Sequence, residues 1–482
     1  MINNANLKHT FHKSILRAYD IRGVYNETLF DNDAYFLGKS FAGFLKKNFQ
    51  NKIAIACDGR LSSPVLKERL VQGLVNSGLY VFDVGLGPTP MLYYAVHHLN
   101  CDAGIMITGS HNPGNHNGFK ITLKDRPFYG NDIANLALIL EDADFYEGQG
   151  VLEIHDIKEN YAQRILQDSI LQKGDSALLN EVDEFNPRKK LKIAWDAGNG
   201  AGGEIMEMLS ENIFAENFLL YKEIDGAFPN HHPDPTVPKN LEDLIAEVKK
   251  HNCDLGIAFD GDADRIGVVD DEGEIIWGDQ LMVFFAREIL LNNPNSTIIA
   301  DVKASNVLFD EIKKSGGKPL MWKTGHSLIK AKMKETNALL AGEMSGHIFF
   351  ADKYFGFDDA LYAAIRLINI VESSDKKLSE LRKELVKTFS TPEIRIECSE
   401  ENKFQMVEDL KKILQKNNEK FDDIDGIRST TEIGWWLIRA SNTQPVLVAR
   451  CEANSMENLQ ILKENLREKL RFCQLTIPEE LQ

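Results

Sequence analysis

The sequence has no long hydrophobic run, and this absence bears on the compartment in which the protein works. None of its uninterrupted apolar stretches approaches the ~20 residues that a membrane-spanning helix needs. Residues 1–12 are polar and lack the apolar core of a secretory signal peptide. Both absences argue against an integral membrane protein and against a secreted one.

The chain also has few cysteines, and it has fewer basic than acidic residues. The six cysteines lie far apart and form no pair with metal-ligand spacing, which is typical of buried free thiols in a reducing compartment. They are Cys57, Cys101, Cys253, Cys398, Cys451 and Cys473. Asp and Glu outnumber Lys and Arg by 72 to 55, and the net charge of -17 disfavours nucleic acid or an anionic membrane as a partner. We therefore expect a cytoplasmic protein, in which a local basic pocket can still bind a small anion.

Hydrophobic residues are abundant, and their spacing predicts alternating strands and helices. They make up 43% of the chain, which is enough for large cores. Residues 52–58 and 80–84 have the pattern of buried strands, and residues 63–77 and 91–98 have helical spacing. This alternation indicates parallel α/β layers.

A strand that ends in aspartate occurs three times along the chain. Asp58 ends the first copy, Asp196 the second and Asp301 the third. Each copy is followed, several dozen residues later, by a second strand that ends in a polar loop. These second strands cover residues 101–105, 253–257 and 337–341, and the first two share the sequence Cys-Asp-x-Gly-Ile. The repeat predicts three related α/β domains with mixed sheets.

The last segment, from about residue 388, has a different pattern. Residues 388–392 resemble a linker, two strands are expected at 435–441 and 445–452, and an amphipathic helix is expected at 456–472. We therefore predict a smaller α+β domain at this end. The four expected domains span residues 1–158, 159–274, 275–387 and 388–482.

The loops after the second strands differ in their chemistry. The first reads TGSHNP (108–113), the second DGDADR (260–265) and the third GEMSGH (342–347). Loops beyond the carboxyl ends of parallel strands carry ligands. Three unlike loops that face one shared cleft would therefore form a composite active site. A further loop, RASNT (439–443), is dense in donors that suit a phosphate.

Three carboxylates alternate in the second loop. Asp260, Asp262 and Asp264 can reach one side of an extended or curved loop, where their charges repel unless a cation joins them. Hard oxygen ligands of this kind suit Mg²⁺. An EF-hand calcium loop fits poorly, because Asp271 stands where its glutamate is expected. A solvated acidic turn is the other alternative.

Ser110 lies where a buried strand gives way to a Gly/Asn/Pro loop, so it is held on a scaffold and open to a ligand. His111 beside it can hydrogen-bond or polarise a group on the serine oxygen. Taken alone, the loop is equally compatible with a polar turn. Together with the metal-type loop and the arginines elsewhere, it indicates phosphoryl transfer through Ser110.

A glycine-rich stretch offers a different hypothesis. Glycines 198, 200 and 203 match the dinucleotide-binding fingerprint. Glu223 lies in range of the acidic position of that motif but does not complete a convincing unit. We therefore prefer a tight strand-to-helix turn.

Taken in order, the motifs resemble the α-D-phosphohexomutase family, and within it the bacterial phosphomannomutase/phosphoglucomutase group. The likeness covers essentially the whole chain. Its motifs are residues 17–23, the serine loop (residues 108–113) with Asn117-Gly118-Phe119-Lys120, and the loops at 260–265, 342–347 and 439–443. Gly109 departs from the pattern, because many members have alanine there, and this is a change between two small residues.

The resemblance implies a four-domain molecule around a central cleft and a role for each loop. Ser110 resembles the family's phosphoserine and would bind Mg²⁺ together with Asp260, Asp262 and Asp264. Lys120 and His326 match the acid/base candidates, and Arg265 completes the catalytic set. The remaining matches would bind the sugar phosphate, and they are Tyr19, Arg22, His111, Lys303, Glu343, Ser345, His347, Arg439, Ser441, Asn442 and Thr443.

The activity that the resemblance implies is transfer of a phosphoryl group between O1 and O6 of mannose or glucose. Hexose 1,6-bisphosphate would be the intermediate and the activator. One alternative is a phosphoglucosamine mutase, although members with that specificity usually carry glutamine where this chain has Met344. Two others are a metal-dependent sugar phosphatase that uses the same serine and a non-catalytic sugar-phosphate-binding protein.

Overall fold

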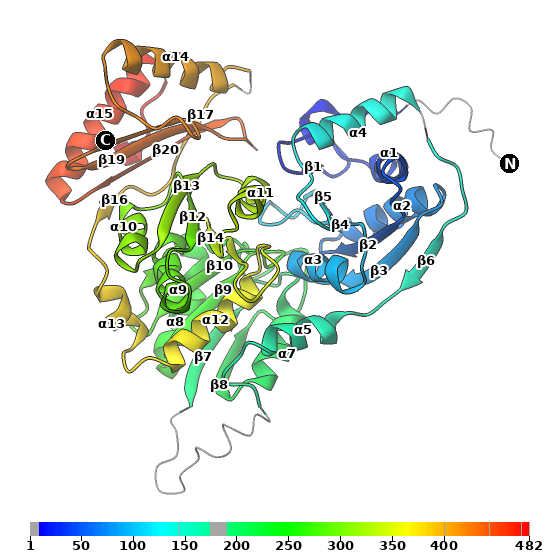
Figure 1. Ribbon diagram of the computed structural model, residues 1–482, viewed down its shortest axis with the longest axis horizontal. Coiled ribbons are helices and arrows are strands. Elements are labelled where there is room, and N and C mark those ends of the chain that lie inside the picture. The colour runs from blue at the N-terminus through cyan, green and yellow to red at the C-terminus, as the bar shows by residue number, and fades with distance from the viewer. Residues whose placement is uncertain are drawn as a thin grey trace, which may run out of the picture.

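A computed structural model describes residues 9–143, 145–173, 190–399, 401–442, 444–473 and 475–481. It contains four β-sheets with their helices (Figure 1). The first sheet lies at the right of the view, the second and third lie below and to the left, and the C-terminal domain, orange to red, lies at the upper left. The predicted class, three α/β domains and a C-terminal α+β domain, is confirmed.

The first sheet has six strands in a mixed arrangement. In spatial order they are β1 (Ile21–Val24), β5 (His116–Leu123), β4 (Ala103–Ile107), β2 (Lys52–Cys57), β3 (Tyr80–Leu86) and β6 (Val151–Ile154). The helices of this region are α1 (Asp31–Lys47), α2 (Ser63–Val75), α3 (Thr89–His98) and α4 (Asn131–Asp142), with a short 3-10 turn, η1 (Lys13–Ile15). Strands β2, β3, β4 and β6 run parallel, whereas β5 is antiparallel to both β4 and β1.

The second sheet has the order β11-β10-β9-β7-β8 and the third has the order β13-β12-β14-β15. The strands of the second are β7 (Leu191–Asp196), β8 (Ala215–Leu220), β9 (Leu255–Phe259), β10 (Ile266–Asp270) and β11 (Ile275–Ile276). Those of the third are β12 (Thr297–Asp301), β13 (Lys318–Trp322), β14 (Leu340–Gly342) and β15 (Ile348–Phe350). Among the described residues between 158 and 383, the helices are α5 (Lys158–Leu166), α7 (Gly203–Asn212), η2 (Pro238–Leu241), α8 (Glu242–His251), α9 (Gly278–Asn292), α10 (Asn306–Lys314), α11 (His326–Thr336), α12 (Ala360–Glu372) and α13 (Leu378–Lys383).

The three sheets contain the same four-strand unit, as the repeat predicts. In each, a central strand (β2, β7 or β12) pairs in parallel with a neighbour on both sides. One of these neighbours (β4, β9 or β14) then forms an antiparallel hairpin with the following strand (β5, β10 or β15). The three motif loops are the connections of these hairpins, so the repeat places three different chemistries at equivalent points.

The C-terminal sheet has the order β16-β20-β19-β18, and β17 also pairs with β20. Its strands are β16 (Phe389–Ser390), β17 (Ile394–Glu397), β18 (Ile427–Thr431), β19 (Gly434–Ala440) and β20 (Val446–Ala453). The helices are α14 (Lys403–Lys416), α15 (Met456–Phe472) and η3 (Glu479–Leu481). The expected linker at 388–392 is partly wrong, because Phe389 and Ser390 pair with β20.

The hydrophobic core joins the first three sheets and leaves the fourth with a core of its own. One cluster contains Met91, Trp195 and Leu361, which come from three different parts of the chain. A separate cluster, with Trp436 and Leu462, fills the C-terminal domain. A smaller cluster of Val302, Trp435 and Leu437 joins the C-terminal domain to the third domain.

The cysteines are all free thiols, but they are not all buried as expected. Cys398 and Cys473 are half-buried, while the other four are buried. Within the described parts of the chain, no helix combines the length and apolar character needed to cross a membrane.

Candidate active site

A cleft of about 580 Å³ is lined by residues from all four domains. It brings together most of the predicted site residues, namely Tyr19, Arg22, Ser110, His111, Lys120, Arg265, Lys303, His326, Glu343, Ser345, His347, Arg439, Ser441 and Asn442. Thr443 lies outside the described residues. Positions more than 400 residues apart in the sequence therefore meet in one cavity, as Tyr19 and Asn442 do through a hydrogen bond.

Ser110 occupies a conformation that few non-glycine residues adopt. Its φ is 50°, in the left-handed region, and the Thr108 hydroxyl accepts a hydrogen bond from its main-chain N–H at 2.8 Å. Its Oγ donates to Asp260 Oδ2 at 3.1 Å and lies 3.3 Å from His111 Nδ1. Backbone strain of this kind clusters at functional sites. Here it directs the hydroxyl towards residues 260–265, the aspartate loop that carries Asp260, Asp262 and Asp264.

His111 is in a setting that favours a neutral ring. Burial and the charges of Arg265 and Arg22 lower its pKa well below the ordinary value for histidine. Its main-chain carbonyl accepts a hydrogen bond from His232 Nε2 at 2.5 Å. The serine loop is therefore attached to the second domain as well as to its own sheet.

Asp260, Asp262 and Asp264 have no exposed surface, and their carboxylate oxygens lie within 4.8 Å of one another. Asp260 Oδ1 accepts the main-chain N–H groups of Asp264 and Arg265, each at 3.1 Å. Lys120 Nζ lies 2.6 Å from Asp262 Oδ2 and 2.5 Å from Asp264 Oδ2. One ammonium group thus pairs with two of the three carboxylates.

The donor set of this loop fits a hard divalent cation. The Oδ1 atoms of Asp262 and Asp264 are buried and have no hydrogen-bond partner. A buried carboxylate oxygen without a partner is costly, and a cation with oxygen ligands would satisfy both atoms together with Asp260. The solvated acidic turn considered from the sequence is wrong, because the three side chains are fully buried.

The charges in this loop shift one another's pKa values. Burial and the charges of Asp264 and Asp262 raise the pKa of Asp260 well above its ordinary value. Burial also opposes the ionised form of Asp262, but the Lys120 ammonium outweighs it and lowers the pKa. Burial of Lys120 is likewise outweighed by Asp262 and Asp264, so its pKa is raised.

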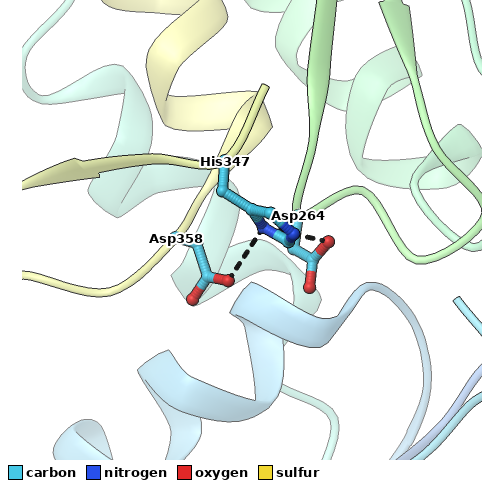
Figure 2. A group of neighbouring side chains, drawn as sticks. All are labelled: Asp264, His347 and Asp358. Atoms are coloured by element: carbon cyan, nitrogen blue, oxygen red, sulfur yellow. Dashed lines mark ion pairs between the residues drawn. The ribbon is translucent and has the colours of Figure 1, made fainter. Parts of the chain in front are cut away.

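His347 is oriented by groups on both of its ring nitrogens. Arg265 Nε donates to His347 Nε2 at 2.9 Å. Because Nε2 accepts, the ring proton belongs on Nδ1, which lies 3.1 Å from Asp358 and 3.5 Å from Asp264 (Figure 2). The carboxylate of Asp358 also pairs with Lys330 at 2.9 Å.

His326 is the first residue of α11 and follows Gly325, whose φ is 132°. Its ring lies 6.0 Å from that of Tyr19 and 5.8 Å from that of His347. Burial and the Lys330 charge lower its pKa well below the ordinary value. A half-buried, neutral imidazole that lines the cleft is suited to accept a proton.

The loop between β14 and β15 presents a carboxylate and a hydroxyl that are bonded to each other. Ser345 Oγ donates to Glu343 Oε2 at 3.0 Å, and the main-chain N–H of Gly325 donates to Glu343 Oε1 at 2.8 Å. Lys303, on the loop after β12, pairs with Glu393 at 3.0 Å. The Lys303 charge lowers the pKa of Glu393 to about 2.

The loop between β19 and β20 brings the C-terminal domain to the cleft. Arg439 Nε donates to Asp425 Oδ2 at 2.8 Å, which orients the guanidinium. Asn442 Nδ2 donates to the Tyr19 hydroxyl, which in turn donates to the carbonyl of Thr324 at 3.0 Å. Parts of the first, third and C-terminal domains therefore meet at Tyr19.

Sequence reasoning missed several residues that shape the site. Arg395 and Arg450 line the cleft, and Arg450 contacts the Met344 sulfur. Arg17 also lines the cleft; it belongs to the 17–23 motif but is absent from the predicted site residues. Asp358 and Arg60 lie behind it. The repeat singles out Asp58 at the end of its first strand, and Arg60 follows two residues later. Their contacts with the serine loop span fifty residues or more, which a local pattern does not reveal.

The glycine-rich stretch forms the tight turn that we preferred over a dinucleotide site. Gly198 has a φ of 52°, and the N–H of Gly200 donates to the Ala197 carbonyl at 2.7 Å. A Cβ on Gly203 would lie 1.9 Å from the carbonyl oxygen of Lys222, so neighbouring backbone fills the space. The turn leads into α7 and packs beside the aspartate loop.

Comparisons with known proteins agree along the length of the chain. Four phosphoglucomutase/phosphomannomutase family descriptions match, namely alpha/beta/alpha domain I at residues 13–147, domain II at 175–273, domain III at 277–389 and the C-terminal domain at 393–469. A phosphomannomutase/phosphoglucomutase of Pseudomonas aeruginosa is 44% identical over 97% of this chain and 98% of its own length. A phosphoglucomutase/phosphomannomutase family crystal structure from Burkholderia thailandensis superposes with a TM-score of 0.88 at 39% identity, covering 97% of this chain and all of that one.

A more distant structure shares the fold. It is an Aspergillus fumigatus N-acetylphosphoglucosamine mutase in complex with GlcNAc-6P and magnesium. Its TM-score is 0.55 at 15% identity, and it covers 80% of this chain and 93% of that one.

Proposed function

Because the chain belongs to the phosphoglucomutase/phosphomannomutase family, we propose that it is a phosphohexomutase that interconverts hexose 1-phosphate and hexose 6-phosphate. Mannose and glucose are the proposed sugars. The observation that carries the proposal is the position of Ser110 Oγ, which lies 3.1 Å from Asp260 in a cleft lined by eight arginines and lysines. A nucleophile beside a carboxylate cluster and opposite cationic groups suits transfer of a phosphoryl group.

The proposed reaction begins with Ser110 phosphorylated. The P–Oγ bond breaks, and a new bond forms between phosphorus and the free hydroxyl of the hexose monophosphate. His326, or Lys120 when it has lost its own proton, takes the proton of that hydroxyl, and the product is a hexose 1,6-bisphosphate. After the bisphosphate turns over in the cleft, its other phosphoryl group returns to Ser110, and the opposite hexose phosphate leaves. The same bisphosphate would act as the activator that phosphorylates Ser110.

Asp260, Asp262 and Asp264, together with the oxygen of Ser110, are the residues that would hold Mg²⁺. When bound there, the ion would neutralise charge that develops on the transferring group. Arg439, Ser441 and Asn442, together with Thr443, would bind the phosphate that is not reacting. Glu343 and Ser345 would hydrogen-bond the sugar hydroxyls between these two sites.

Ser110→Ala tests the proposal directly. The variant should fold, because its hydroxyl contributes little to the core, and should lose about a thousandfold or more of the rate, as expected for a lost nucleophile. Intact mass should show phosphate on the wild type after incubation with glucose 1,6-bisphosphate and none on the variant. Near-normal turnover by the variant would contradict the phosphoserine mechanism.

The reaction product distinguishes a mutase from the alternative, a sugar phosphatase. Wild-type protein incubated with glucose 1-phosphate should form glucose 6-phosphate, detected by ³¹P NMR. Stoichiometric release of inorganic phosphate instead would establish hydrolysis. Accumulation of neither product, with Ser110 never phosphorylated, would favour a binding protein.

A further inference from the structure

Arg60 is buried beneath the serine loop and does not line the cleft. Its side chain is 1% exposed, and its two terminal nitrogens donate to four main-chain carbonyls of residues 110–116. Nη2 lies 2.7 Å from the carbonyl oxygen of Ser110 and 2.6 Å from that of Asn112. Nη1 lies 2.5 Å from the oxygen of Pro113 and 2.9 Å from that of His116.

Asp58 completes the attachment on the other side of Arg60. Its Oδ2 accepts Arg60 Nε at 3.2 Å and also the main-chain N–H of Gly109 at 3.2 Å. Its Oδ1 accepts the hydroxyl of Ser63 at 2.5 Å. The carboxylate therefore holds the residue before Ser110, while the guanidinium holds the carbonyls that follow it.

Gly109 leaves the room that this arrangement needs. A Cβ at this position would lie 2.4 Å from Arg60 Cζ and 2.5 Å from its Nε. The guanidinium cannot withdraw easily, because Phe228 of the second domain covers it at 5.3 Å. The exchange between glycine and alanine, which looks minor in the sequence, is therefore not a neutral change in this chain.

We propose that Arg60 is a positioning residue that holds the serine loop in the shape from which Ser110 exchanges its phosphoryl group. Four carbonyl dipoles converge on one point only because a cation with several directed donors lies among them. Without that cation, the oxygens would repel one another, and the strained φ of Ser110 would relax. Arg60 has no hydrogen bond to Ser110 Oγ, so its effect on the reaction passes through the loop.

Arg60→Lys is the main test, because lysine keeps the charge but places its donors at one point and cannot span four carbonyls. We expect kcat to fall about 30- to 100-fold, because a nucleophile displaced by about 1 Å loses roughly that much rate. KM should stay within about threefold, because the groups that bind the distant phosphate are untouched. Arg366→Lys is the matched control: Arg366 is equally buried but pairs with Asp352, away from the cleft, and this variant should lose stability without losing kcat.

Amide hydrogen exchange gives a readout that does not depend on activity. Peptides that cover residues 108–118 should exchange faster in Arg60→Lys than in the wild type, while peptides over residues 342–347 should not change. A variant with reduced thermal stability but unchanged kcat and unchanged exchange in the loop would overturn the proposal and leave Arg60 as a purely structural residue.

Gly109→Ala provides a second approach if Arg60→Lys does not fold. It should displace the guanidinium without removing it and lower kcat by about tenfold, with faster exchange over the same residues. In the double variant, the two losses should be less than multiplicative, because both act on one contact. Unchanged kcat and exchange in Gly109→Ala would also overturn the proposal.

The expected fall in kcat rests on the proposed function, but the role of Arg60 in the serine loop and the proposed function can fail separately. A wild type that makes no hexose 6-phosphate would refute the proposed function. The exchange measurement would still decide whether Arg60 holds the loop.

Discussion

Single residues in the aspartate loop carry the metal hypothesis. Asp262 has one oxygen bonded to Lys120 and to the Thr89 hydroxyl, and a second buried oxygen without a partner. Asp262→Asn removes one negative charge and replaces one potential ligand oxygen by an amide. We expect Mg²⁺ to bind at least about tenfold more weakly, a difference of about 1.4 kcal/mol, and kcat to fall with it.

The measurement is Mg²⁺ affinity by calorimetry, together with the rise in Tm that the ion produces in each protein. Asp270→Asn is a suitable control, because Asp270 is also fully buried in the second sheet but pairs with Arg382 outside the cleft. That variant should lose stability and keep its Mg²⁺ affinity. A wild-type rate that survives complete chelation would refute the metal assignment.

His231 should make stability depend on pH. Burial opposes its charge, but the hydrogen bond and charge of Asp196, 2.9 Å away, outweigh burial and raise the pKa of His231 above the ordinary 6.5. A raised folded-state pKa means that the stabilisation is fully present below the unfolded value of about 6.5 and is lost as pH rises through the folded-state value. In urea unfolding between pH 6 and pH 9, the wild type should therefore lose more stability than His231→Gln. Equal losses in the two proteins would show that this pair contributes nothing.

At the scale of elements, the sequence was most informative where strands end. The strands before Ser110 and Asp260 are apolar runs, and their carboxyl ends could be located from local pattern alone. The hairpin returns at β5, β10 and β15 were not specified by that pattern, because antiparallel pairing depends on contacts between strands. For the same reason Arg60 and Asp358 escaped prediction, since each acts on groups from another segment of the chain.

The loop between β14 and β15 depends on a glycine. Gly346 has a φ of 91°, and a Cβ there would lie 2.4 Å from the carbonyl oxygen of Ile266 on β10. Gly346→Ala should lower the free energy of unfolding by about 1–2 kcal/mol for the conformation and by about 1–3 kcal/mol more for the collision. KM for the sugar phosphate should rise, because Glu343 and Ser345 lie on the same loop.

Gly356→Ala is the matched control for this change. Gly356 has a similar φ of 81°. A Cβ added there would have the Cβ of Ala351 as its nearest neighbour, at 3.6 Å, which is an ordinary van der Waals contact. Denaturant unfolding should therefore show a smaller loss for Gly356→Ala, with KM unaffected. Equal losses in the two variants would mean that conformation alone, and not the contact with β10, makes glycine necessary at position 346.

At the scale of the whole molecule, the loop after β12 is a main attachment point of the C-terminal domain. Arg428 donates to the carbonyls of Val302 and Ala304, and Arg450 donates to that of Lys303. These three contacts reach the loop after β12, and a small apolar cluster of Val302, Trp435 and Leu437 lies at the same boundary. Further hydrogen bonds join the domain to Thr324 and to Tyr19, so we expect an opening of the cleft to break these contacts and its closure around a sugar phosphate to restore them.

The cleft as a whole also predicts which sugars are used. By family resemblance, Glu343 and Ser345 would bind O3 and O4, which glucose and mannose place identically, since these sugars differ only at C2. When the bisphosphate turns over, O3 and O4 exchange places and the same pair can hold them. A site discriminates only through groups that it contacts, so we expect kcat/KM for glucose 1-phosphate and mannose 1-phosphate to agree within about tenfold, or about 1.4 kcal/mol.

Glucosamine 1-phosphate should be a clearly poorer substrate for an electrostatic reason. Eight arginines and lysines line the cleft against four carboxylates, so a protonated amino group at C2 enters a field of its own sign. The test is kcat/KM for the three sugar phosphates at one concentration of Mg²⁺ and of the matching bisphosphate, repeated at higher ionic strength. Screening should narrow the gap for glucosamine phosphate and leave the ratio of glucose to mannose unchanged. A preference for glucosamine phosphate, or a gap of several hundredfold between glucose and mannose, would mean that another part of the cleft reads C2.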